Sequence, residues 1–176
     1  MAALRLARYE RVLMHIRFIT TGGTIDKVYF DELSQFEVGE SVVEHTLREG
    51  LVRFDWDVVP LMKKDSLEIK DADRQVLRDY IANDDATHYV VTHGTDTMPE
   101  TAEFLNDLEG RTIVLTGALT PARFRTTDAV FNVGMAVAAV QTLAPGAYIV
   151  MNGQVFAAGA VRKNRAENRF EATDRS

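Results

Sequence analysis

Two loops of the chain gather groups that could attack and hold a small ligand. Residues 20–25 read TTGGTI and residues 92–98 read THGTDTM, so both loops combine glycine with hydroxyl side chains. Glycine lets backbone N–H groups approach a ligand closely, and a threonine hydroxyl becomes a nucleophile when a base or an acidifying environment activates it. The alternative is structural, because hydroxyls in such turns often bond the backbone and Thr97 could act as the N-cap of a following helix.

The residue inventory argues against several other kinds of chemistry. The chain has no cysteine, which excludes thiol nucleophiles, thiolate zinc sites and iron–sulfur clusters. His88 and His93 lie five residues apart on a predicted strand and would point to opposite faces, and no H-E-x-x-H motif occurs, so we expect no metal site. We interpret His93 as a buried, hydrogen-bonded anchor of its loop rather than as a base. Neither G-x-x-x-x-G-K-[ST] nor G-x-G-x-x-G is present, which leaves glycine content as the only argument for a nucleotide.

An alternation of strands and helices must position the two loops. Short apolar runs predict buried strands, and apolar residues spaced three and four apart predict helices between them. This order implies parallel βαβ units, so we expect an α/β fold of three layers: a mainly parallel, twisted sheet with helices on both faces, flavodoxin-like or Rossmann-like. Ligands bind beyond the carboxyl ends of the strands in such sheets, and both loops fall there. The expected strands are 15–21, 54–62 with its alternation ending at Pro60, 88–93, 112–117 and 147–153, and the expected helices are 41–51, 72–84, 99–108 and 126–143.

Length and charge narrow the class of protein. The 176 residues fit one ordinary domain, which we predict to span residues 14–176 after an N-terminal extension of residues 1–13. The 20 basic and 26 acidic side chains give a net charge of −6, which argues against a nucleic-acid partner. No apolar run is long enough to span a membrane, so we expect no membrane partner. Arg5, Arg8 and Arg11 interrupt any secretory apolar region, and we therefore expect a cytoplasmic protein.

The predicted helix 126–143 is apolar nearly all round and contains several small residues. A helix of this kind is normally buried. One interpretation places it in the subunit interface of a homo-oligomer, a dimer or a tetramer. The other is a central helix that its own domain covers.

Taken together, the two loops resemble the bacterial-type L-asparaginase family. The similarity rests on TGGTI at 21–25, HGTDTM at 93–98, LTGA at 115–118 with Pro121, VMNG at 150–153 and VRKN at 161–164. It runs from about His15 to Lys163 and matches only the family's N-terminal domain. The chain is most similar to short-chain members, in which no C-terminal domain follows.

The resemblance implies hydrolysis of L-asparagine to L-aspartate and ammonia without a cofactor. By motif, Thr24 corresponds to the primary nucleophile, which forms a β-aspartyl acyl-enzyme. Thr95 and Lys163, with Asp96, correspond to the second catalytic set, and Asp96 also holds the substrate amino group. Further substrate contacts fall on the Ser66 hydroxyl, expected to bind the substrate carboxylate, and on the main chain of Gly94 and Ala118.

The chain departs from the family pattern at several positions. Phe36 stands where the family's flexible flap carries a tyrosine, and Tyr29, five residues after Thr24, is expected to supply that hydroxyl instead. The alternative is a Tyr29 ring that packs on the domain. Asp26 replaces a residue that is commonly small, and Leu67 replaces a frequent polar substrate-binding residue.

The role of Lys163 stays open on sequence alone. A free lysine has a pKa near 10.4, so about one in 2,500 is neutral at pH 7, and lowering this pKa to about 7 requires roughly 4.6 kcal/mol of burial or like charge. Asp96 would favour the ammonium instead. Lys163 could be a base, or it could stay charged, orient Thr95 and stabilise negative charge. Without the resemblance, it would be a solvated member of a basic run.

Two other functions compete with asparagine hydrolysis. One is a non-catalytic amino-acid-binding or sensor domain, although such a domain has no need of a nucleophile. The other is an amidohydrolase of the same fold that acts on glutamine or another amide.

Overall fold

The computed structural model describes residues 14–30 and 35–173, with the side chains of Phe30 and Gln35 excepted. The predicted N-terminal extension, residues 1–13, lies outside the described residues. Within them, no helix is long and apolar enough to cross a membrane.

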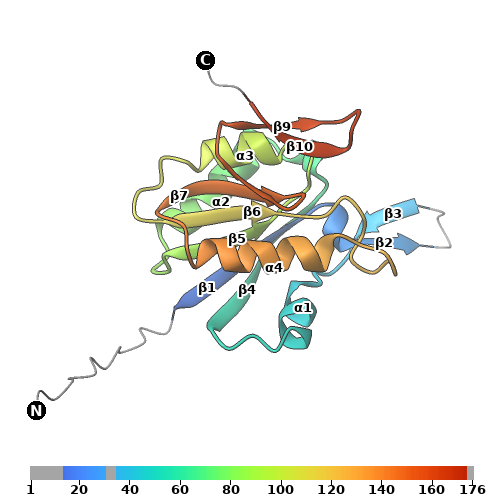
Figure 1. The fold of residues 1–176 in the computed structure, drawn as a ribbon, viewed down its shortest axis with the longest axis horizontal. Coiled ribbons are helices and arrows are strands. Elements are labelled where there is room, and N and C mark those ends of the chain that lie inside the picture. Colours follow the sequence, from blue (N-terminus) through green and yellow to red (C-terminus); the bar gives the residue numbers. More distant parts are fainter. Residues whose placement is uncertain (1–13, 31–34, 174–176) are drawn as a thin grey trace, which may run out of the picture.

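A six-stranded sheet forms the centre of the molecule (Figure 1). Its order is β4-β1-β5-β6-β7-β8, and the first five strands run parallel while β8 pairs antiparallel with β7. This confirms the predicted α/β class and the mainly parallel sheet. The strands are β1 (His15–Gly22), β4 (Asp55–Lys64), β5 (His88–Thr92), β6 (Thr112–Thr116), β7 (Gly146–Met151) and β8 (Gln154–Ala157).

Helices cover both faces of the sheet, which completes the three predicted layers. One apolar cluster joins the sheet to α2 (Asp71–Ala82) and α3 (Met98–Phe104), through residues such as Leu77 and Met98. A second cluster joins the opposite face to α1 (Val43–Glu49) and α4 (Ala129–Val140), which crosses the near face in Figure 1. The inner strands β5 and β6 are almost entirely buried, as expected for parallel strands covered on both faces, whereas the edge strands β4 and β8 are largely half-buried or exposed.

Several expected elements have different bounds in the structure. The predicted helix 126–143 is shorter, because α4 begins at Ala129 and ends at Val140. The predicted strand 54–62 is confirmed and extends further, since β4 continues through Pro60 to Lys64. Pro60 is exposed and β4 is the edge strand of the sheet, where a missing N–H removes no ladder bond.

The expectation that the 126–143 helix is buried holds for one side only. Asn132, Val133 and Ala136 face the interior, whereas the Val130 and Phe131 side chains are 59% and 60% exposed. No described part of the chain covers that outer side of α4.

Two small antiparallel hairpins were not expected from the sequence. The first pairs β2 (Lys27–Phe30) with β3 (Gln35–Val38), and we call this pair the flap hairpin. The second pairs β9 (Val161–Asn164) with β10 (Arg169–Ala172), above α3 in Figure 1. Short 3₁₀ turns, η1 (Thr24–Asp26) and η3 (Ser66–Glu68), follow β1 and β4.

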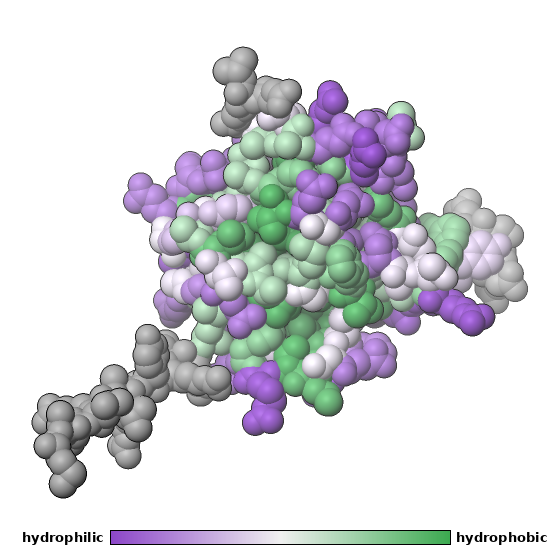
Figure 2. All heavy atoms as spheres, viewed as in Figure 1, coloured by the Kyte–Doolittle hydropathy of each residue, from purple (hydrophilic) through white to green (hydrophobic). Residues whose placement is uncertain are grey.

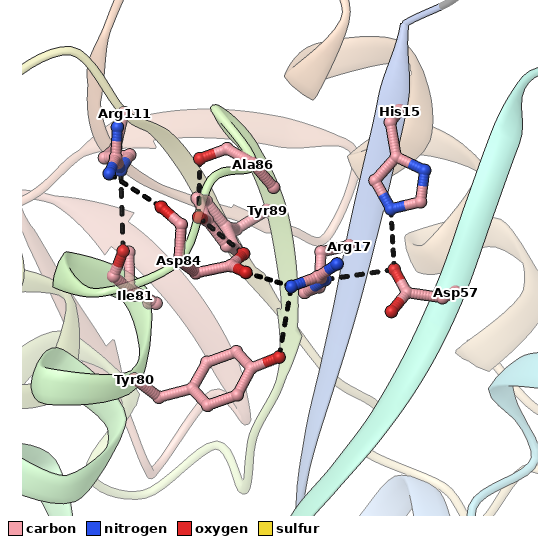
Figure 3. A network of polar contacts seen from close by, with 9 residues as sticks. All are labelled: His15, Arg17, Asp57, Tyr80, Ile81, Asp84, Ala86, Tyr89 and Arg111. Carbon is pink, nitrogen blue, oxygen red and sulfur yellow. Dashed lines mark hydrogen bonds and ion pairs between the residues drawn. The ribbon is translucent and has the colours of Figure 1, made fainter.

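A polar network ties the amino ends of the strands to the end of α2 (Figure 3). The Arg17 guanidinium lies between Asp57 and Asp84 and bonds both carboxylates. The Tyr89 hydroxyl donates to Asp84 at 2.9 Å, and Arg111 donates to the Asp84 carbonyl at 2.9 Å. Although burial opposes it, the two carboxylates raise the pKa of Arg17, while burial raises the pKa of Tyr89. The network is therefore a charged clamp at the end of the sheet opposite the two threonine-rich loops.

Candidate active site

The candidate site lies at the carboxyl ends of the parallel strands. The TTGGTI loop ends β1, the THGTDTM loop follows β5, and the segment 117–128 follows β6. The turn after β4 and the β9–β10 hairpin complete the surroundings. This placement confirms the expectation that both loops meet at one edge of the sheet.

Glycines hold these loops in direct backbone contact. A Cβ on Gly23 would lie 2.4 Å from Gly94 Cα, and a Cβ on Gly94 would lie 2.5 Å from Ser66 Cβ. Gly23 has a positive φ of 89°, and its N–H donates to the Lys64 carbonyl at 2.9 Å. No side chain fits between the three loops, so their backbones form one continuous floor.

Thr95, Asp96 and Lys163 come together on this floor. The Lys163 ammonium, carried by β9, donates to the Thr95 hydroxyl at 2.6 Å and to Asp96 Oδ1 at 2.9 Å. The Lys163 side chain is only 11% exposed, and Thr95 is buried. Arg165 Nε lies 3.6 Å from the same Asp96 oxygen. Lys163 is therefore not the solvated surface residue that its basic surroundings in sequence suggest.

Ser66 joins the set through Asp96. Its hydroxyl accepts the Asp96 N–H at 3.3 Å and lies 3.5 Å from Asp96 Oδ2. The Ser66 carbonyl accepts the Thr97 hydroxyl at 2.8 Å, and Thr97 makes no capping bond to α3. Thr97 is thus the N-cap residue of α3 by position, but its hydroxyl ties the second loop to η3 instead of capping the helix.

The candidate nucleophile Thr24 is half-buried in the turn η1. The next residue, Ile25, is fully buried against Ala118, and its carbonyl accepts the Ala122 N–H at 3.1 Å. These contacts place the Thr24 turn beside the 117–128 segment, as the motif predicts for Thr24 and Ala118.

Asp128 and Asn132 shape that segment, and the sequence analysis missed both. The Asp128 carboxylate accepts the Leu119 and Thr120 N–H groups at 3.0 Å, and Asn132 donates to the Gly117 carbonyl at 3.0 Å. Their spacing of four residues at the start of a predicted helix was the available signal.

Tyr29 is not brought to the Thr24 hydroxyl in this structure. It is 51% exposed, and its ring contacts Phe36 across the flap hairpin in a tilted arrangement, with 5.3 Å between the ring centroids. Phe36 in turn lies 6.0 Å from the Phe124 ring. Among the described residues, the Tyr29 hydroxyl makes no hydrogen bond. Tyr29 thus belongs to an aromatic group at the outer side of the flap hairpin.

His93 anchors its loop, as predicted. The ring is fully buried, and burial lowers its pKa to about 4, so the imidazole is neutral. Nδ1–H donates to the Gly94 carbonyl at 2.7 Å, which leaves Nε2 to accept the Thr101 hydroxyl at 3.0 Å. Arg74 Nε donates to the same hydroxyl oxygen at 3.1 Å. This chain fixes the peptide after His93 without placing a base at the site.

A polar cavity of about 410 Å³ opens beside the Lys163–Asp96 pair, between α3 and β9. Charges of both signs line it, which suits a zwitterionic ligand. Within the described ranges, no group of three or more histidine, aspartate or glutamate side chains is arranged to hold a metal ion. The cavity is lined by Asp96, Pro99, Glu100, Glu103, Gly159, Val161, Arg162, Lys163 and Arg165.

The family model of the asparaginase N-terminal domain matches residues 15–174. The chain belongs to the asparaginase family. It is 32% identical to the L-asparaginase of Bacillus licheniformis over 168 residues, which cover 87% of this chain and 51% of that relative. It is 38% identical to the glutaminase-asparaginase of Acinetobacter glutaminasificans over 95 residues, 51% of this chain and 28% of that one.

Solved asparaginases share the fold. L-asparaginase I from Vibrio cholerae superimposes with a TM-score of 0.79 at 24% identity, over 90% of this chain and 51% of that one. The chain therefore spans about half the length, or less, of the relatives it matches.

Proposed function

We propose that this asparaginase-family chain is an amidohydrolase that converts L-asparagine and water to L-aspartate and ammonia. The observation that carries the proposal is the buried contact of Lys163 with Thr95 and Asp96, on a backbone floor that Gly23 shares with the second loop. A domain that only binds an amino acid would not require a lysine buried against a threonine hydroxyl.

In the proposed first step, the Thr24 oxygen attacks the side-chain amide carbon of asparagine. The Thr24 proton leaves with the amine as ammonia, and a β-aspartyl ester remains on Thr24. Water then adds to the ester, its hydroxyl going to the acyl carbon and its other proton back to Thr24. Backbone N–H groups of the stacked loops are suited to hold the oxyanion in both steps.

Different groups of the site are proposed to bind the different ends of the substrate. Asp96 binds the substrate ammonium, and the Ser66 hydroxyl, with the main chain of Gly94, Thr95 and Ala118, binds the carboxylate and amide ends. In this scheme Lys163 stays charged: its ion pair with Asp96 favours the ammonium, which orients the Thr95 hydroxyl and stabilises negative charge. A base role would first require loss of a proton that two acceptors hold.

The test is ammonia release from L-asparagine and L-glutamine by the full chain and by Thr24→Ala. We expect release from asparagine that disappears in the variant. A second candidate, glutamine hydrolysis, has the support of the relative named as a glutaminase-asparaginase, and a higher kcat/KM with glutamine would establish it. If neither amide releases ammonia while asparagine still raises the melting temperature, the chain would instead be a binding domain.

Tyr29 is proposed to complete the site from the flap hairpin, which would have to fold inward because the hydroxyl is free of hydrogen bonds within the described residues. Tyr29→Phe should lower kcat by tenfold or more, since a positioned hydroxyl typically contributes at least that much to proton transfer. Tyr80→Phe, at the opposite end of the sheet, is the control. A wild-type rate for Tyr29→Phe would remove Tyr29 from the mechanism.

We also propose that the protein is a homo-oligomer, because the outer side of α4 presents apolar side chains to solvent. Its cytoplasmic location stays a prediction from the sequence.

A further inference from the structure

Asp26 is a buried acid two residues after the candidate nucleophile. It is 1% exposed, so its carboxyl group is almost entirely shielded from solvent. Its carboxylate Oδ1 accepts the Val42 N–H at 3.1 Å, and its carbonyl accepts the Gly39 N–H at 2.8 Å. Both contacts lie on the far side of the flap hairpin in sequence.

Asp26 therefore joins the two ends of the flap hairpin at one residue. β2 leaves directly after Asp26, and β3 returns at Val38 to the Gly39 N–H that Asp26 binds. The approach is close, because a Cβ on Gly39 would lie 3.1 Å from the Asp26 carbonyl oxygen. Any shift of Asp26 must move the Thr24 turn and the base of the hairpin together.

The polar and charged groups around Asp26 come from two segments, residues 40–42 and Arg123. Burial raises the pKa of the Asp26 carboxyl group to about 6, while the Val42 N–H, the Ser41 hydroxyl and the Arg123 guanidinium oppose that shift and Glu40 adds to it. Arg123 itself donates to the Glu40 carbonyl at 3.4 Å. Burial thus makes the charge of the carboxylate costly, and the Val42, Ser41 and Arg123 groups offset only part of that cost.

We propose that Asp26 is a positioning residue, whose ionised carboxylate holds the Thr24 turn and the base of the flap hairpin in the arrangement that the reaction needs. The inference rests on the proposed amide hydrolysis. An ordinary structural role would be to bind the Val42 N–H at the start of α1, and an amide oxygen can do the same. Asp26→Asn therefore separates the charge of the side chain from its hydrogen bond.

The first measurement is the pH profile of kcat/KM for ammonia release by the wild type and Asp26→Asn. We expect the wild-type value to fall as pH drops through about 6, toward the value of the variant. Asp26→Asn should be about tenfold slower at pH 8, as expected for a small misplacement of reacting groups, and should lack this acid limb. Asp107→Asn, an exposed carboxylate far from the flap hairpin, is the control.

Substitutions of two residues beside Asp26 should move the acid limb in opposite directions. Ser41→Ala removes a group that favours the ionised form, so the acid limb should move to higher pH. Glu40→Gln removes a like charge, so the limb should move to lower pH. Thermal melting of each variant confirms that it is folded. An acid limb that survives unchanged in Asp26→Asn overturns the inference.

A second measurement needs no substrate. Hydrogen-exchange protection of the amides of Lys27, Gly39 and Val42 should change in Asp26→Asn and, in the wild type, between pH 8 and pH 5 after correction for intrinsic exchange rates. Since the raised pKa makes the ordered arrangement less stable when Asp26 is ionised, the protection should rise in both cases. Equal protection in both proteins at both pH values overturns the inference. If the wild type releases no ammonia, the proposed function fails, and the exchange result alone decides the role of Asp26.

Discussion

The Lys163 ammonium occupies a place between a hydroxyl and a carboxylate that suits a cation better than a free base. Asp96 stabilises its charge, and Thr95 accepts its shortest hydrogen bond. Because the Thr95 oxygen accepts a hydrogen bond from Lys163, the single hydroxyl proton of Thr95 must point toward a different acceptor. At this scale, the chemistry depends on single contacts that substitution can remove one at a time.

Lys163→Met should lower kcat for asparagine by at least about 100-fold, because the variant loses both the charge and the orientation of Thr95. The matched control is Arg169→Met, which removes an exposed cation of the same hairpin that is paired with Glu171 and does not line the cavity. Steady-state ammonia release measures both. A Lys163→Met enzyme with the rate of Arg169→Met would show that the contact is structural.

Asp26→Asn should also change how stability depends on pH. The pKa of Asp26 is about 6 in the folded protein and ordinarily 3.8, so the folded state binds more protons between these values and stability falls as pH rises through them. At pH 8 the ionised carboxylate costs up to about 3 kcal/mol, which the amide avoids. Urea denaturation at pH 8 and pH 5 should show a larger gain for the variant at pH 8. Equal gains at both pH values would contradict the raised pKa.

At the scale of elements, the candidate site and the main polar network lie at opposite ends of the sheet. The carboxyl ends carry the candidate site, while the amino ends carry the Arg17 clamp of Figure 3. A defect in the clamp should therefore lower stability and leave catalysis unchanged in the molecules that stay folded.

Asp84→Asn tests this division. The variant leaves the half-buried Arg17 charge with one carboxylate instead of two, so the free energy of unfolding should fall by about 1–2 kcal/mol. We expect kcat/KM at 25 °C to match the wild type. Asp107→Asn removes an exposed carboxylate and should leave the free energy of unfolding close to that of the wild type. A loss of kcat/KM in Asp84→Asn would show that the two ends are coupled.

Elements with a strong local pattern could be predicted, and the others could not. The buried strands and α2 follow from apolar periodicity, and the meeting of the two loops follows from the parallel order. The hairpins β2–β3 and β9–β10 have four-residue strands, too short for a clear alternation, and contacts distant in sequence hold them. The burial of Lys163 was equally invisible, because it depends on where β9 packs. The approach of Arg165 to Asp96 was equally hidden, because Arg165 lies in the turn after β9, where no strand periodicity places it.

At the scale of the whole molecule, an apolar area on one face is left without cover. Figure 2 shows hydrophobic residues spread over the region of α4, with polar residues toward the edges of the view. Phe131 lies within 3.8 Å of the place a Cβ on Gly153 would take, so the area continues from α4 to the turn before β8. Its exposed members are Val130, Phe131 and Val155.

Phe131→Glu should therefore reduce the particle mass measured by light scattering to that of a single chain, because a buried unpaired charge is costly in an interface. The control is Val76→Glu, which places the same charge at an exposed apolar residue of α2, on the other side of the sheet. A wild-type mass for Phe131→Glu would exclude this area from the interface.

The position of Lys163 in the chain sets a condition on when activity can arise. A nascent chain that has emerged as far as Met151 contains all five parallel strands, the Thr24 turn and the Thr95–Asp96 loop, yet it lacks the ammonium group. Lys163 arrives on β9, whose hairpin is held by the buried Phe170 ring and by the bond of the Phe170 N–H to the Asn152 side chain at 2.9 Å. The contact of Lys163 with Thr95 and Asp96 is therefore the last part of the candidate site to be synthesised, after the sheet that carries the other two residues.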